Sequence, residues 1–86
     1  MESPLKAIRK NRLKLSTAEF AQLCHCSTAS VNYAERGTEN ITPAILRTLG
    51  ELRFDVEALR QEHNEFRAEQ AAKLRERVER ELNLTT

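Results

Sequence analysis

Helix-starting signals recur at short intervals along this 86-residue chain. In each one, a side chain that can cap a helix precedes either a proline or a run of apolar residues at helical spacing. Only two glycines and two prolines are present, and these are too few turn-forming residues for a fold of many short strands. The sequence therefore predicts an all-α fold of five helices. The five signals are Ser3-Pro4, Ser16-Thr17, Ser27, Thr42-Pro43 and Asp55.

Apolar residues between these signals recur at steps of three and four, as they do on one face of an amphipathic helix. Glu19 lies three residues after Ser16, which is the spacing of a capping box. Gly37 follows the third apolar run, at the place where a left-handed residue often ends a helix. We expect helices that begin at Pro4, after a cap at Ser16 or Thr17, at Thr28, at Pro43 and after Asp55, the last of them reaching about residue 82.

The formal net charge of +1 conceals an uneven distribution along the chain. Residues 1–15 carry a net charge of +4, whereas residues 16–54 carry −1 and residues 55–86 carry −2. A basic N-terminal end suits a polyanionic partner. A solvated helix face with incidental charge explains the same counts, so the pattern alone leaves both interpretations open.

The apolar runs are short. None approaches the length of a membrane span, and the N-terminus lacks the apolar core of a secretory signal. The only two cysteines, Cys24 and Cys26, flank a single residue, so a disulfide scaffold is not expected. We expect a cytoplasmic protein that does not contact a membrane.

Cys24, His25 and Cys26 form the densest group of reactive side chains in the sequence. A metal site requires three or four converging ligands, and the only other histidine is the distant His63. A buried free cysteine behaves as a small apolar residue, and histidine tolerates the positive φ that a tight turn demands. We interpret the group as structural and expect no metal, cofactor or catalytic residue. A metal or redox sensor is the competing hypothesis.

The stretch "LSTAEFAQLCHCSTASVNYAERG" resembles the Cro/repressor-type helix-turn-helix domain, also called the XRE family, and "TPAILRTLGELRFDVEAL" is similar to that family's closing pair of helices. The resemblance covers about residues 4–60. It implies a five-helix, lambda-repressor-like DNA-binding domain over residues 1–60, followed by a C-terminal helical extension over residues 61–86. The residues that carry the resemblance are Leu15, Ser16, Phe20, Ala21, Cys24, Cys26, Ser27, Val31, Glu35 and Gly37.

The resemblance implies that the helix over 28–36 enters the major groove of DNA, with Val31 and Ala34 turned inward. Where the family often has Gln, Arg or Lys, this helix begins with Thr28, Ala29 and Ser30. Asn32 suits an adenine, and the helix starts and the following loop suit phosphates. The expected DNA-binding residues are Ser16, Thr17, Ser27, Thr28, Ala29, Ser30, Asn32, Tyr33, Arg36 and Asn40.

Glu35 lies two residues before Gly37, where the family has an inward glutamate paired with an arginine of the first helix. Arg12 shares a helical face with Leu5 and Ile8. We therefore expect a structural ion pair between Arg12 and Glu35, with Arg9 as the second choice of partner. Such a shielded pair would hold the third helix against the first one.

An apolar stripe runs along the last predicted helix, which is longer than a domain of this size needs. Its own chain offers few neighbours to cover the stripe, so we expect a second copy to do so in a homodimer. A solvated and partly frayed helix is the alternative. The expected dimer residues are Leu59, His63, Phe66, Leu74, Val78 and Leu82.

These expectations combine into one functional hypothesis. The chain is expected to be a sequence-specific transcriptional regulator that binds double-stranded DNA, most simply a dimeric repressor that reads an inverted repeat. The alternative keeps the same fold but makes a protein partner the main ligand, as in antitoxins or anti-activators of similar architecture.

Overall fold

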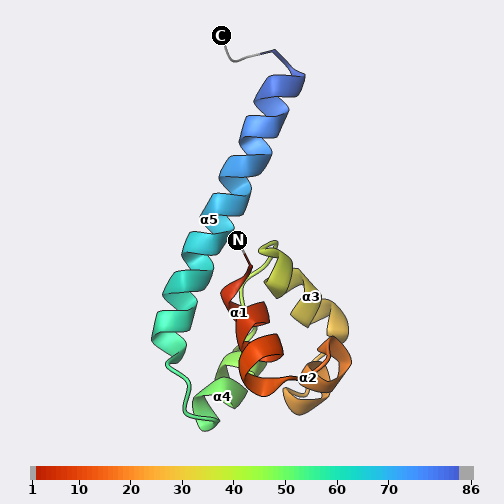
Figure 1. Cartoon of the computed structure of the whole chain (residues 1–86), viewed down its shortest axis with the longest axis vertical. Coiled ribbons are helices and arrows are strands. Elements are labelled where there is room, and N and C mark those ends of the chain that lie inside the picture. Colours follow the sequence, from red (N-terminus) through yellow and green to blue (C-terminus); the bar gives the residue numbers. More distant parts are fainter. Residues whose placement is uncertain (1, 84–86) are drawn as a thin grey trace.

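The computed structural model describes residues 2–83. Within that range the chain forms five α-helices and no strand, and the last helix is by far the longest (Figure 1). The all-α prediction is therefore confirmed. Met1 and residues 84–86, which belong to the expected N-terminal domain and C-terminal extension, lie outside the described residues. The elements are α1 (Pro4–Ala7), the π-helical η1 (Ile8–Leu13), α2 (Thr17–Leu23), α3 (Thr28–Arg36), α4 (Pro43–Glu51) and α5 (Val56–Glu81).

All five predicted caps form. At each helix start an oxygen of the capping side chain accepts a hydrogen bond from a backbone N–H three residues ahead, which satisfies one of the donors that a helix start leaves free. Ser16, not Thr17, caps α2, and Glu19 completes the predicted capping box. The five bonds, between 3.0 and 3.4 Å long, join Ser3 to Lys6, Ser16 to Glu19, Ser27 to Ser30, Thr42 to Ile45 and Asp55 to Ala58.

Residues with a positive φ end most of the helices. Gly37 (φ 80°) ends α3, as expected from its lack of a side chain. His25 (φ 56°) does the same after α2, which confirms its predicted role as a turn residue. Arg53 follows α4 with φ 72°. A residue in the left-handed conformation thus follows these helices even where that residue is not glycine.

The first helix changes its winding after Ala7 and continues as the π-helix η1. Lys14 then takes a left-handed conformation with φ 56°. The N–H of Leu15 reaches back to donate to the carbonyl of Arg9 at 3.0 Å, and the Arg9 guanidinium donates to the carbonyl of Leu15 at 2.9 Å. The wider turn of η1 is therefore closed around Arg9.

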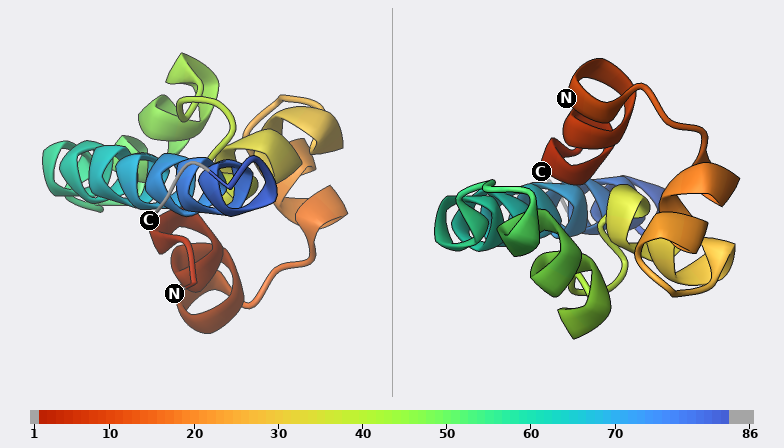
Figure 2. Two further views of the ribbon diagram at one scale, coloured as in Figure 1. Left: turned by 90° about the horizontal axis from the view of Figure 1, so that it is seen from above. Right: turned by 90° about the horizontal axis from the view of Figure 1, so that it is seen from below.

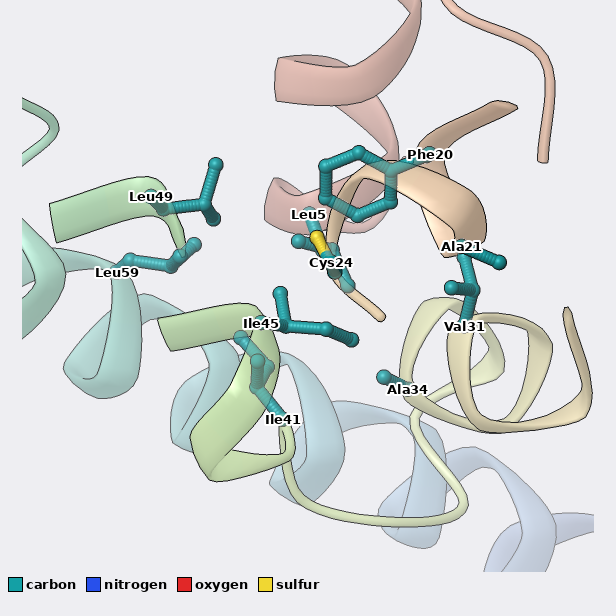
Figure 3. Packing of buried hydrophobic residues seen from close by; sticks show 10 residues of the cluster. All are labelled: Leu5, Phe20, Ala21, Cys24, Val31, Ala34, Ile41, Ile45, Leu49 and Leu59. Atoms are coloured by element: carbon teal, nitrogen blue, oxygen red, sulfur yellow. The ribbon is translucent and has the colours of Figure 1, made fainter. Parts of the chain in front are cut away.

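One hydrophobic core joins all five α-helices. Leu5, Phe20, Val31, Ile45 and Leu49 are completely buried. Cys24 belongs to the same cluster and is also buried, which confirms its predicted role as a small core residue (Figure 3). The core holds α3 by its inner face only.

The first half of α5 packs on the body of the molecule, and its second half extends beyond the body (Figure 1). Leu59, His63 and Phe66 are buried against their own chain. The expected boundary at residue 60 therefore falls inside a continuous helix, because three further turns of α5 complete the fold. No helix between residues 2 and 83 has both the length and the apolar character of a membrane span.

Candidate nucleic-acid interface

α2 and α3 lie side by side at one side of the body, where both views of Figure 2 place them together. Four residues, 24–27, connect the two helices. His25 turns the chain through its positive φ, and Ser27 at once caps the next helix. A short turn of this kind fixes the angle between the two helices. The structure thus has two short helices joined by a four-residue turn, as the sequence predicted.

α3 has a buried face and an exposed face. Val31 and Ala34 are completely buried, as predicted. On the other side Thr28, Ala29 and Arg36 are exposed, as is Tyr33 with 43% of its surface accessible. The remaining two candidates on this face, Ser30 and Asn32, are partly buried.

Two hydroxyls of the expected interface are already engaged. The Oγ atom of Ser27 accepts a hydrogen bond from the Ser30 N–H at 3.1 Å and lies 3.0 Å from the Oγ atom of Ser30. Both side chains thus belong to the cap of α3. Asn32 has no side-chain hydrogen bond to another residue between 2 and 83, so its amide is available to a ligand.

The start of α2 carries a negative charge beside the predicted phosphate contacts. The Ser16 N–H donates to a Glu19 carboxylate oxygen at 2.9 Å, and Ser16 Oγ accepts from the Glu19 N–H at 3.1 Å. These hydrogen bonds, first the one from the Ser16 backbone, lower the pKa of Glu19. The carboxylate would oppose a phosphate at this position, and the expected phosphate contacts of Ser16 and Thr17 stay a prediction.

Asn40 is also occupied. Its side-chain Oδ1 accepts a hydrogen bond from the Arg67 guanidinium of α5. Arg67 Nε additionally donates to the Gly37 carbonyl at 3.4 Å, and the His63 Nε2–H donates to the Glu39 carbonyl at 2.8 Å. Asn40 thus has a structural role in which α5 holds the loop that follows α3, and its expected contact with a phosphate, which would use the amide nitrogen, stays a prediction.

The predicted ion pair forms, but with Arg9 and not with Arg12. Arg9 Nε donates to Glu35 Oε2 at 2.7 Å, and Arg9 Nη2 donates to Glu35 Oε1 at 3.0 Å. Only 9% of each side chain is accessible. The hydrogen bond to Glu35 is the main cause that raises the pKa of Arg9. A two-bonded pair of this kind fixes both the distance and the orientation between η1 and α3.

The Arg12 prediction was wrong because it assumed regular α-helical winding up to the joint. The π-helical turn redirects the side chains that follow Ala7. Arg12 instead lies over the ring of Phe54, with its guanidinium carbon 5.3 Å from the ring centre. This contact joins η1 to the residues just before α5.

The two thiols are poorly placed for metal or redox chemistry. Cys24 is 1% exposed, and Cys26 is partly buried. Burial raises the pKa of both thiols, so the reactive thiolate is scarce near neutral pH. Between residues 2 and 83, no group of three or more His, Cys, Asp or Glu side chains is arranged to hold a metal ion.

Sequence reasoning missed the contact between α5 and the end of α3. Phe66 packs so closely on Gly37 that a Cβ atom built there would lie 2.9 Å from the ring. The spacing of Leu59, His63 and Phe66 at three and four residues was the available signal, but the prediction placed these residues in a dimer interface. That assignment was wrong for these three residues because their own chain covers them. Leu74, Val78 and Leu82 of the same stripe remain exposed.

The site is thus a nine-residue helix, capped at both ends, whose inner face is packed and whose outer face is open. The outer side chains are small, amide or aromatic groups, with one cation at the last residue, Arg36. The Arg9–Glu35 ion pair joins α3 to η1, and Arg67 of α5 binds the loop that follows α3. Comparison of the chain with models of protein families, with curated protein sequences and with solved structures finds no match.

Proposed function

We propose that this protein binds double-stranded DNA in the manner of a Cro/repressor-type regulator, with α3 in the major groove and α2 across the backbone. The observation that carries the proposal is the division of α3 into two faces. Val31 and Ala34 are completely buried, while Thr28, Ala29, Tyr33 and Arg36 are exposed. A surface helix held this firmly from inside, with no charge on its first two turns, has an outer face suited to the edges of bases.

The size of α3 suits the groove. An α-helix with its side chains is about 10–12 Å in diameter, and the major groove of B-DNA is about 12 Å wide. The Ser27 cap lies at the start of α3, where backbone amides and the helix dipole favour an anion. A phosphate of the duplex would meet this end.

Exposed basic side chains support a polyanionic ligand. Arg36 ends α3 and is exposed, and so are Lys10, Arg12 and Lys14, whereas Arg9 is buried and paired with Glu35. Lys10 keeps 52% of its side chain accessible, although a carboxylate of Glu2 lies 3.9 Å away. These charges would act on phosphates without reading sequence, so binding should weaken as salt concentration rises.

We further propose that two copies bind together on an inverted repeat and repress by covering a promoter. The exposed Leu74, Val78 and Leu82 recur every four residues on the free half of α5, and they offer a self-complementary contact. The free helix is only about 20 Å long. A pair of such helices buries well under the ~1,600 Å² of a standard stable interface. The dimer should therefore be weak in solution and form mainly on DNA.

One observation favours a second candidate function, which is binding of another protein by the tail. Leu74, Val78 and Leu82 are 53%, 47% and 61% exposed, and such a stripe also fits the groove of a partner protein. In that case DNA binding would be weak or lost. A tight complex with a protein partner, together with no retention of any duplex, would decide for this alternative.

Selection of bound sequences from a pool of random duplexes tests the proposed function. An enriched inverted repeat is the expected result, and its half-sites should be centred about one helical turn apart, near 34 Å. Asn32→Ala should reduce discrimination between sequences more than it reduces overall affinity. The exposed Asn64 of α5 provides a matched control as Asn64→Ala, which should behave as the wild type. No retention of duplex at low salt would contradict the proposal.

A further inference from the structure

We infer that the base pairs beneath the first two turns of α3 are A·T pairs, recognised mainly through thymine methyl groups and the adenine edge. The inference rests on the proposed function and specifies its substrate. It follows from which side chains of α3 are accessible to solvent and which of these already make hydrogen bonds within the protein. Thr28, Ala29 and Asn32 are the readers that remain.

The exposed face of α3 lacks the usual reader of guanine. Guanine offers two acceptors, O6 and N7, in the major groove, and the commonest specific contact to them is an arginine or lysine that donates to both. Residues 28–35 contain no arginine or lysine. The first cation is Arg36, the last residue of the helix. The two-donor contact to guanine is thus restricted to the outer flank of the half-site.

Ser30 and the exposed Thr28 carry hydroxyls that could contact any base, and the Ser30 hydroxyl is already engaged. This hydroxyl lies 3.0 Å from Ser27 Oγ, and the Ser30 backbone N–H donates to the same atom at 3.1 Å. Ser30 therefore stabilises the start of α3 and contributes little to the choice of base.

Most of the accessible groups that make no hydrogen bond at the start of α3 are methyl groups. Ala29 and Thr28 are both exposed and each presents a methyl group. Among the four bases, only thymine presents a methyl group in the major groove, so apolar contact there distinguishes thymine from cytosine. Burying one methyl group in such a contact corresponds to about a fourfold gain in affinity.

Asn32 supplies the polar part of the recognition. It lies one turn after Thr28 and Ala29 on the same face, and its amide is free of hydrogen bonds to other described residues. An asparagine amide can accept from adenine N6 and donate to adenine N7 at once. Thymine methyl contacts at the start of α3 and an adenine contact one turn later together favour a run of A·T pairs.

The test uses the duplex recovered by selection and a copy in which deoxyuridine replaces thymidine within the half-site. This exchange removes only the C5-methyl group. The wild type should bind the deoxyuridine duplex about fourfold more weakly for each methyl that it contacts. Ala29→Gly should bind both duplexes with more nearly equal affinity. Ala68→Gly, an equivalent change at an exposed position of α5, should keep the full difference.

A gain-of-function variant gives an independent readout. Ala29→Arg should move the selected sequence toward guanine at one position of the half-site, because it supplies the missing paired donor. A thermal unfolding measurement on both Ala29 variants is the control that shows whether they are folded. A G·C-rich selected half-site, or equal wild-type affinity for the two duplexes, would overturn the inference and leave DNA binding intact. Failure of the wild type to retain any duplex would instead overturn the proposed function.

Discussion

Arg9 and Glu35, which are 26 residues apart in sequence, form two parallel hydrogen bonds of 2.7 and 3.0 Å. Arg9 also donates to the Leu15 carbonyl at 2.9 Å. One guanidinium thus joins the first helix, the joint after it and the last turn of α3. Because so little of either side chain is accessible, the charges are shielded from solvent and depend on each other.

Glu35→Gln should lower the free energy of unfolding by about 3 kcal/mol, since it leaves the shielded charge of Arg9 without its counter-charge. Urea denaturation monitored by circular dichroism measures the change. Arg12→Met is the matched control, because Arg12 makes only a cation–π contact with Phe54, worth about 0.5–1 kcal/mol at an exposed site. A larger loss for Arg12→Met than for Glu35→Gln would contradict the assignment of the pair.

Gly37→Ala should destabilise the fold by about 1–3 kcal/mol, for two reasons that both lie in the structure. The backbone of Gly37 has φ 80°, and a new Cβ atom would lie 2.9 Å from the Phe66 ring. Gly50→Ala is the control, because the nearest side-chain atom to a Cβ there is 3.8 Å away. Gly50 lies inside α4, so its replacement should stabilise the protein by about 0.5–1 kcal/mol. Equal effects of the two changes would contradict both the left-handed conformation of Gly37 and the close packing of Phe66 on it.

Glu19 gives the fold a defined sensitivity to acid. Its folded-state pKa is lowered from the ordinary value of 4.5, so the charged form stabilises the folded state above that pH. This contribution is lost as the pH falls through the folded-state pKa. Glu19→Gln keeps a hydrogen-bond acceptor at the cap but cannot titrate. The wild type should therefore lose stability relative to this variant as the pH falls below the ordinary value of 4.5; parallel pH profiles would rule out the role of the carboxylate.

The two cysteines should differ in reactivity toward a thiol reagent such as dithionitrobenzoate. Cys24 is buried in the core and should react only when the protein unfolds, whereas the partly buried Cys26 should react slowly in the native state. The Cys26→Ser variant isolates the signal of Cys24, and urea supplies the unfolded reference. Rapid reaction of Cys24 in the native protein, or binding of zinc in equilibrium dialysis, would support the competing hypothesis of a metal or redox sensor.

Local features of the fold were predictable from the sequence. All five caps and the turn at His25 depend on residues within a few positions of each other, and they were found correctly. The partner of Glu35 was not predictable, because the choice between Arg9 and Arg12 depends on the π-helical winding of η1. The stripe on α5 showed that Phe66 is covered but could not show by what. The same periodicity would arise from a second copy or from the molecule's own loop.

Mapping of backbone amide shifts by NMR during titration with the selected duplex tests the central claim most directly. The account predicts that the largest shifts occur at Thr28, Ala29, Asn32 and Tyr33, with smaller ones at the start of α2. With a duplex that contains a single half-site, only one copy of the protein binds. The amide shifts of Leu74 and Val78 should then stay unchanged. Shifts concentrated on α4 or on the free half of α5, with α3 unchanged, would contradict the claim that the outer face of α3 meets the DNA.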